Sequence, residues 1–168
     1  MRDSNGNSNH GADELKSRIA GWARELGFSA MGVTSIDIEQ HRARLTEWLD
    51  RGFHGEMDYM QRRAELRLKP ELLQPGTVSV ISVRMDYLPE AQEDALAMLD
   101  HPTKAYVSRY AGGRDYHKLM RKRLKHLATR IREQTGQLEA RPFVDSAPVL
   151  EKPLAQNAGL GWIGKHTN

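Results

Sequence analysis

Apolar side chains recur every three to four residues in two long stretches, the spacing of one face of a helix. The first stretch carries four such residues: Leu15, Ile19, Trp22 and Leu26. Gly27 follows it and is a typical helix stop. The second stretch extends from Asp115 to Thr135 and carries five: Leu119, Met120, Leu124, Leu127 and Ile131. The sequence therefore predicts two amphipathic helices, one near each end of the chain.

Runs rich in β-branched and aromatic residues between these helices predict strands. The expected strands are residues 28–35, 77–87, 105–110 and 141–144. Shorter helices are expected after Asp37, at 91–99 and at 150–158, with a short helix or turn at 54–63 and a loop at 70–75. We therefore predict an α/β or α+β fold, a mixed sheet flanked by helices. Residues 1–12 are polar and expected to be a disordered leader, which leaves 13–168 as one domain.

The richest stretch for chemistry lies between Pro142 and His166. Asp145 ends the apolar run Phe143-Val144, as an acid would at the mouth of a strand. A possible short helix and a glycine cluster follow it, and Lys165 closes the stretch. A carboxylate, a glycine-rich turn and a cation are parts of a site. The alternative is that Asp145 merely caps the helix that begins near Pro148.

Gly159, Gly161 and Gly164 fit the G-x-G-x-x-G fingerprint of dinucleotide-binding proteins. That fingerprint requires a preceding strand and an acidic residue about 20 positions further on, whereas residues 150–158 read as helix. A helix C-cap explains Gly159 without any ligand. Gly161 and Gly164 would then mark places where the backbone approaches another group closely.

Two motifs in this region resemble the epoxyqueuosine reductase family, QueG: Val144-Asp-Ser-Ala-Pro-Val-Leu-Glu-Lys152 and Ala158-Gly-Leu-Gly-Trp-Ile-Gly-Lys-His-Thr167. Three further stretches strengthen the resemblance. They are His54-Gly-Glu-Met-Asp-Tyr-Met60, Leu72-Leu-Gln-Pro-Gly76 and Ser108-Arg-Tyr-Ala-Gly-Gly-Arg-Asp-Tyr-His-Lys118. The resemblance extends from about Leu15 to the last residue, in the expected order.

The resemblance implies an enzyme that reduces the epoxide of epoxyqueuosine in tRNA to queuosine, with cobalamin and two 4Fe–4S clusters. It also implies that Asp145 is the proton donor, and apolar neighbours would disfavour its charged form. The candidate cobalamin contacts share glycines, aromatic faces or hydrogen-bonding groups: Ser108, Tyr110, Asp115, Tyr116, His117, Lys152, Gln156, Asn157, Gly161, Trp162, Lys165 and His166.

The chain departs from this family in one large respect, since its 168 residues contain no cysteine. Iron–sulfur clusters are held by cysteine thiolates. In the family those ligands lie in a ferredoxin-like domain after the Gly-Lys-His segment. We therefore expect a cobalamin and substrate domain that is incomplete at its C-terminal end and inactive alone.

The formal net charge is only +3, but one helix concentrates the positive charge. The helix predicted from Asp115 to Thr135 carries these cations on its outer face. Such a basic face is explained either by simple exposure to solvent or by binding to a phosphate backbone. A tRNA substrate favours the second interpretation. The candidate tRNA contacts are Arg114, Lys118, Arg121, Lys122, Arg123 and Lys125.

No apolar run approaches the ~20 residues that span a bilayer, and the absence of cysteine is weakly typical of the cytoplasm. We expect a cytoplasmic monomer whose partners are tRNA carrying epoxyqueuosine and an electron donor. Two alternatives remain open: a cobalamin-dependent reductase of a small molecule, similar to reductive dehalogenases, and a non-catalytic tRNA-binding fragment.

Overall fold

The computed structural model describes residues 5–87, 95–111, 113–136 and 138–165. The elements that position the site are α1 (Asn5–Glu25), β1 (Ala30–Ser35), β2 (Ser79–Arg84), α6 (Tyr116–Thr135) and α7 (Glu151–Asn157). The remaining helices are η1 (Glu39–His41), α2 (Arg42–Asp50), α3 (Asp58–Arg62), α4 (Ala64–Leu68), η2 (Pro70–Leu72), α5 (Ala95–Leu99) and η3 (Arg109–Ala111).

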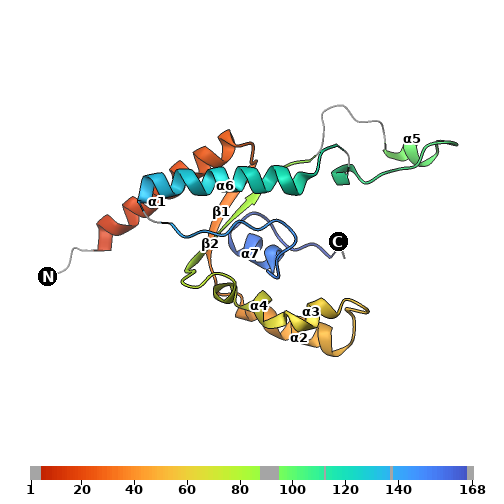
Figure 1. Ribbon diagram of the computed structural model, residues 1–168, viewed down its shortest axis with the longest axis horizontal. Helices are drawn as coiled ribbons and strands as arrows, with labels where there is room; N and C mark the ends of the chain where they lie inside the picture. Colours follow the sequence, from red (N-terminus) through yellow and green to blue (C-terminus); the bar gives the residue numbers. More distant parts are fainter. Residues whose placement is uncertain (1–4, 88–94, 112, 137, 166–168) are drawn as a thin grey trace.

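The two strands form an antiparallel pair at the centre of the molecule (Figure 1). Their register runs from Ala30 opposite Arg84 to Ser35 opposite Ser79. Because successive side chains of a strand point to opposite faces, each face of this sheet takes every second residue. Helices cover both faces, so both strands are partly withdrawn from water.

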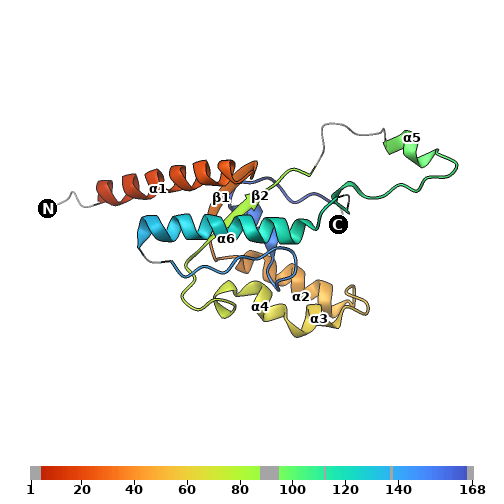
Figure 2. The ribbon, with the colours of Figure 1, turned by 45° about the horizontal axis from the view of Figure 1, so that its top comes forward.

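One face packs against α1 and α6, which lie side by side across the strands (Figure 2). Its core consists of five buried residues from the two helices and from the turn after α1: Ile19, Ala23, Phe28, Leu127 and Ile131. Met31, Ile81 and Val83 pack onto this cluster from the sheet. The apolar stripes predicted for both helices therefore face each other and the sheet.

The opposite face carries α7, which contacts both strands. Gly32 is buried here, and a Cβ added to it would lie 2.1 Å from the carbonyl oxygen of Ala158 at the end of α7. The helix ends in a Schellman motif, since the N–H groups of Gly159 and Leu160 donate to the carbonyls of Gln156 and Ala155. Gly159 takes the left-handed conformation that this motif needs (φ 79°), as the C-cap interpretation predicts.

Two segments lie outside this layered centre. Helices α2, α3 and α4 form a group below the sheet in Figure 1, and α5 stands far from the strands in both ribbon views. Leu96, within α5, is 70% exposed, and Val107, in the segment after α5, is 64% exposed.

The confirmed fold class is a sheet flanked by helices, but the described sheet is antiparallel where a mixed sheet was expected, and two expected strands do not form. Residues 105–110 are an extended segment that enters η3, and 141–144 have no regular structure. Strand formation requires a pairing partner, and within the described ranges the sheet contains only β1 and β2. Residues 5–12, expected to be disordered, belong to α1, because an established helix can extend by one hydrogen bond per residue.

Candidate functional site

Asp145 lies between the first turns of α6 and α7 and has an uncommon backbone conformation. Its φ is 53°, and it is the single residue other than glycine with positive φ in the described part of the chain. The N–H of Ser146 donates to the carbonyl of Val144 across it, at 2.6 Å, which closes a tight three-residue turn. Backbone strain of this kind clusters at functional sites.

The carboxylate of Asp145 meets two side chains of α6. The Tyr116 hydroxyl donates to Oδ2, and Nε2 of His117 lies 3.4 Å from the same oxygen. The rings of Tyr116 and His117 are stacked, with centroids 4.1 Å apart. Hydrogen bonding to Asp145, with smaller effects from desolvation and charge, raises the pKa of Tyr116 to about 12. The phenol therefore keeps its proton at neutral pH.

Asp115 orients His117 from the other side. Its Oδ1 accepts from the His117 backbone N–H at 2.9 Å and lies 3.2 Å from Nδ1 of the same residue. Asp115 is thus the N-cap of α6, a position that favours aspartate. Desolvation opposes its charged form, but the hydrogen bonds from His117 outweigh it and lower the pKa of the Asp115 carboxyl.

Glu151 is a member of this cluster that the sequence analysis did not select. Its Oε1 accepts from the Asp145 backbone N–H at 3.2 Å, so the first residue of α7 fixes the turn. Desolvation by the surrounding protein disfavours the charged form, and repulsion from Asp145 adds to this effect, so the pKa of Glu151 is raised. Its signal in the sequence is its place in the Val144 to Lys152 motif, six residues after Asp145.

Two expectations for Asp145 are wrong. Its side chain is 51% exposed, so apolar neighbours do not withdraw it from water within the described residues. It does not cap α7 either, because the N-cap position belongs to Leu150 and no side-chain cap is present. The chain turns at Asp145 and runs on for several residues before α7 begins.

The candidate cofactor residues gather in three places. Ser108 and Tyr110 lie at η3, and the Tyr110 ring meets Tyr116 edge-on at 6.2 Å. Asp115, Tyr116 and His117 form the start of α6. The others lie on or after α7, where His166 falls outside the described residues: Lys152, Gln156, Asn157, Gly161, Trp162 and Lys165. The Asn157 amide donates to the carbonyl of Asp37 at 3.4 Å, so it also serves the fold.

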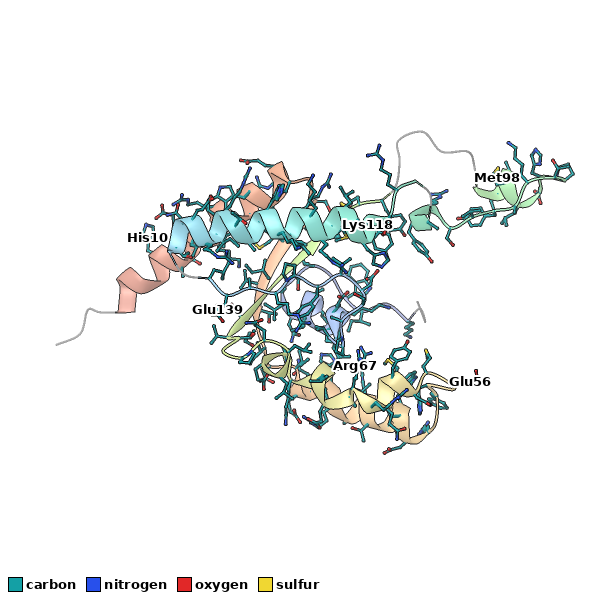
Figure 3. All side chains as sticks on the ribbon, viewed as in Figure 1. His10, Glu56, Arg67, Met98, Lys118 and Glu139 are labelled. Carbon is teal, nitrogen blue, oxygen red and sulfur yellow. The ribbon has the colours of Figure 1, made fainter. Side chains whose placement is uncertain are left out.

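Most of the candidate tRNA contacts face solvent along α6 or just before it. Lys118, Arg121, Lys122 and Lys125 follow the i, i+3, i+4, i+7 spacing of one helix face, and all are exposed. Figure 3 shows Lys118 near the start of that helix. Arg123 differs, because its guanidinium turns inward to the Gly27 carbonyl and to Met85 Sδ at 3.1 Å. The exposed basic face of α6 is therefore Lys118, Arg121, Lys122 and Lys125, with Arg114 before it.

Solved structures show where this fold occurs. An epoxyqueuosine reductase from Streptococcus thermophilus matches with a TM-score of 0.72 at 26% identity, covering 89% of this chain and 40% of that protein. An epoxyqueuosine reductase solved with an epoxyqueuosine-modified tRNA-Tyr stem loop matches with a TM-score of 0.71 at 23% identity, over 89% and 39%. The chain therefore has a fold that occurs within epoxyqueuosine reductases.

The sequence leads to the same proteins. Residues 67–146 match the family described as "Epoxyqueuosine reductase QueG, DUF1730". The chain is 54% identical to the reductase of Aliivibrio fischeri over 92% of its length and 56% identical to that of Pseudomonas aeruginosa over 91%. This chain is a homologue of the epoxyqueuosine reductases, and the resemblance inferred from its motifs is confirmed. It spans 41% and 42% of the length of these two curated relatives.

No helix among residues 5–87, 95–111, 113–136 and 138–165 has both the length and the apolar character to cross a membrane.

Proposed function

We propose that this chain supplies the proton-donating face of an epoxyqueuosine reductase, an enzyme of the cytoplasm that converts epoxyqueuosine in tRNA to queuosine. The observation that carries the proposal is the position of Asp145. Its carboxyl is half-exposed, on a strained turn, between the starts of two helices. The level of identity to the named reductases, 54% for one of them, supports the same reaction.

The chemistry explains why a carboxyl is needed there. Removing an epoxide oxygen breaks both of its bonds to carbon, forms a carbon–carbon double bond and releases water, so two electrons and two protons are consumed. A proton donor beside the departing oxygen lowers the barrier to the first bond cleavage. The Asp145 carboxyl is exposed on this turn, so it can reach a substrate that approaches from solvent. Tyr116 and His117 contact its Oδ2.

The candidate cofactor residues at η3 and after α7 suit a flat apolar ligand with amide edges, as cobalamin is. Trp162 is 87% exposed and Tyr110 is 57% exposed, so both offer ring faces. Gly161 leaves open space, since no described atom lies within 4 Å of the Cβ it lacks. Cobalamin bound there would supply the redox chemistry at its cobalt. The residues that would hold it are Ser108, Tyr110, Lys152, Gln156, Gly161, Trp162 and Lys165.

The chain does not fit a 4Fe–4S cluster, because it contains no cysteine to supply thiolate ligands. Electrons would have to reach the site from a different polypeptide region or from a separate donor. The contribution of these residues is then to bind, orient and protonate the substrate.

The exposed basic face of α6 would receive the tRNA backbone. Phosphate contacts of this kind position a nucleic acid and carry no sequence information themselves. The face starts at Lys118, the residue directly after His117, so RNA lying on it would pass close to Asp145. A non-catalytic tRNA-binding role is the second candidate, favoured by the same basic face together with the absence of cysteine.

The decisive experiment compares substrates for the full-length reductase that contains these residues. Purified enzyme loaded with cobalamin and supplied with reductant is given either an anticodon stem loop carrying epoxyqueuosine or the free epoxyqueuosine nucleoside. We expect conversion of the stem loop and much slower conversion of the nucleoside. Equal conversion of the two would favour a small-molecule reductase, and binding of the stem loop without any conversion would favour the non-catalytic role.

A further inference from the structure

The proposed reaction requires a second proton that Asp145 alone does not hold. A carboxyl carries one transferable proton, whereas release of the epoxide oxygen as water consumes two. After the first transfer Asp145 is a carboxylate beside an oxygen that still needs protonation. A group in contact with Asp145 must return a proton to it, or solvent must do so. The need for this second proton rests on the proposed function.

Three described side chains contact Asp145, and two of them are poorly suited to this task. Tyr116 holds its proton firmly, because hydrogen bonding to Asp145 raises the pKa of the phenol to about 12. Glu151 accepts from the backbone N–H of Asp145 and is not bonded to its carboxylate. His117 remains, with Nε2 3.4 Å from Oδ2 of Asp145. Imidazole is the side chain whose ordinary titration lies closest to neutral pH.

The His117 ring is also held in a fixed position, as a group that passes protons to Asp145 would have to be. Its Nδ1 lies 3.2 Å from Asp115, its ring is stacked on Tyr116, and its backbone N–H is fixed by the same Asp115 carboxylate. The side chain is 40% exposed, so the imidazole can take up a proton from water. An imidazole between two carboxylates, with one edge in solvent, connects water to the proton donor.

We propose that His117 returns a proton to Asp145 within each turnover, with Asp115 holding the imidazole in place, so that both protons reach the departing oxygen through one carboxyl. A proton moves from Nε2 of His117 to Oδ2 of Asp145, and water restores the proton on His117. The two electrons would be supplied by reduced cobalamin, the cofactor of the proposed enzyme. His117 acts through Asp145 and is therefore a positioning residue.

The kinetic test uses full-length enzyme carrying His117→Gln or His117→Ala, with His126→Gln as the matched control on the exposed surface of the same helix. Turnover should fall about 10- to 100-fold for both His117 variants, since solvent can partly replace the imidazole. KM for the stem loop should change by less than about 2-fold, because no group that binds the stem loop is removed. Added imidazole should restore much of the rate of His117→Ala and none of the rate of Asp145→Asn. Normal turnover of both His117 variants, or no recovery with imidazole, would overturn the proposal.

A spectroscopic test does not depend on turnover and so separates this proposal from the proposed function. In enzyme labelled with ¹⁵N at histidine, Asp145→Asn should shift the Nε2 signal of His117, and Asp115→Asn should shift its Nδ1 signal. The His126 signals should not move in either variant. If the wild-type enzyme does not reduce the stem loop, the proposed function fails. These signals still show whether His117 contacts Asp145 and Asp115. Unchanged His117 signals in both variants would overturn the proposal.

Discussion

Asp145 differs from an ordinary surface aspartate in its backbone, because its left-handed conformation is one that few side chains tolerate. Aspartate and asparagine adopt it most readily after glycine, and other residues are disfavoured by roughly 1–2 kcal/mol. The turn therefore selects the residue type independently of its chemistry. Any substitution at this position must be judged on both grounds.

Asp145→Asn should separate the two roles, because asparagine keeps the size and the backbone tolerance but has no acidic proton. General acid catalysis typically contributes about 100- to 10,000-fold, so single-turnover reduction by the full-length enzyme should fall by that order. The melting temperature should stay nearly unchanged. Asp145→Ala should lose the same activity and also about 1 kcal/mol of stability from backbone strain. Near-normal reduction by Asp145→Asn would show that Asp145 is not the proton donor.

Tyr116 provides a pH-dependent signature of the same cluster. Its folded-state pKa of about 12 exceeds the ordinary tyrosine value of 10.0, so the folded chain holds this proton more tightly than the unfolded chain. The corresponding stabilisation is fully present below pH 10 and is lost as the pH rises toward 12. In an absorbance titration, one of the five tyrosines should ionise late, and Tyr116→Phe should remove that step. Tyr110→Phe is the control and should leave the late step in place.

At the scale of elements, α6 divides into an inner apolar face, an outer basic face and a first turn that carries the site. Asp115 caps it at one end, and Gly136 ends it with φ 76° at the other. Both bounds were predicted because caps and periodicity are local in sequence. The direction of Arg123 was not predicted, because it depends on Gly27 and Met85, which are distant along the chain.

Reversing the charge of Arg121, Lys122 and Lys125 to glutamate should weaken tRNA binding by the full-length enzyme. The plot of log K against log salt has a negative slope. Each phosphate that is no longer neutralised should make that slope shallower by about 0.7–0.9. Arg24, Arg44 and Arg62 are exposed on other helices, so their joint reversal makes the same change in net charge away from α6. An equal effect in this control would show that net charge alone governs binding.

Gly32→Ala should destabilise the junction between the sheet and α7. The added Cβ would lie 2.1 Å from the Ala158 carbonyl oxygen. This oxygen belongs to the backbone at the end of a capped helix, so it cannot easily move away. Overpacking of this kind lowers stability by about 1–3 kcal/mol. Gly21→Ala in α1 is the control, because nothing lies within 4 Å of its added Cβ and alanine favours helix. A melting temperature for Gly32→Ala equal to that of wild type would contradict the close packing.

The strands show the limit of local reasoning. Residues 28–35 and 77–87 were predicted as strands and contain β1 and β2, shortened at their ends. Residues 105–110 and 141–144 have similar compositions but no strand beside them in the described structure. The site divides in the same way. Asp145 and its α6 neighbours each belong to recognisable motifs, whereas the hydrogen bond from Tyr116 to Asp145 joins residues 29 positions apart and follows from the tertiary fold.

The whole molecule is a layered centre from which α5 and the segment that follows it stand apart (Figure 2). Chain segments from two regions of the sequence, the start of α6 around Tyr116 and the stretch from Asp145 to Glu151, meet at that centre. The site therefore depends on the tertiary fold and not on any isolated peptide. The proposed reduction would also need an electron supply that these residues do not contain.

The purified 168-residue chain should fail to reduce epoxyqueuosine in tRNA, even with added cobalamin, because it has no cysteine to hold a cluster. Full-length enzyme assayed beside it with the same chemical reductant is the positive control. Binding of the stem loop by the short chain should persist, since the basic face of α6 is intact. Repeated turnover by the short chain would show that clusters are dispensable for electron delivery.

The left-handed turn at Asp145 also has a consequence for how such a site can be lost over evolutionary time. Single-base changes in an aspartate codon reach asparagine and glycine, the two residues that share its tolerance of this backbone. Either would silence the acid while leaving the chain able to fold. Gene copies released from selection for reduction should therefore drift first to asparagine or glycine at this codon, and persist as stable, inactive proteins.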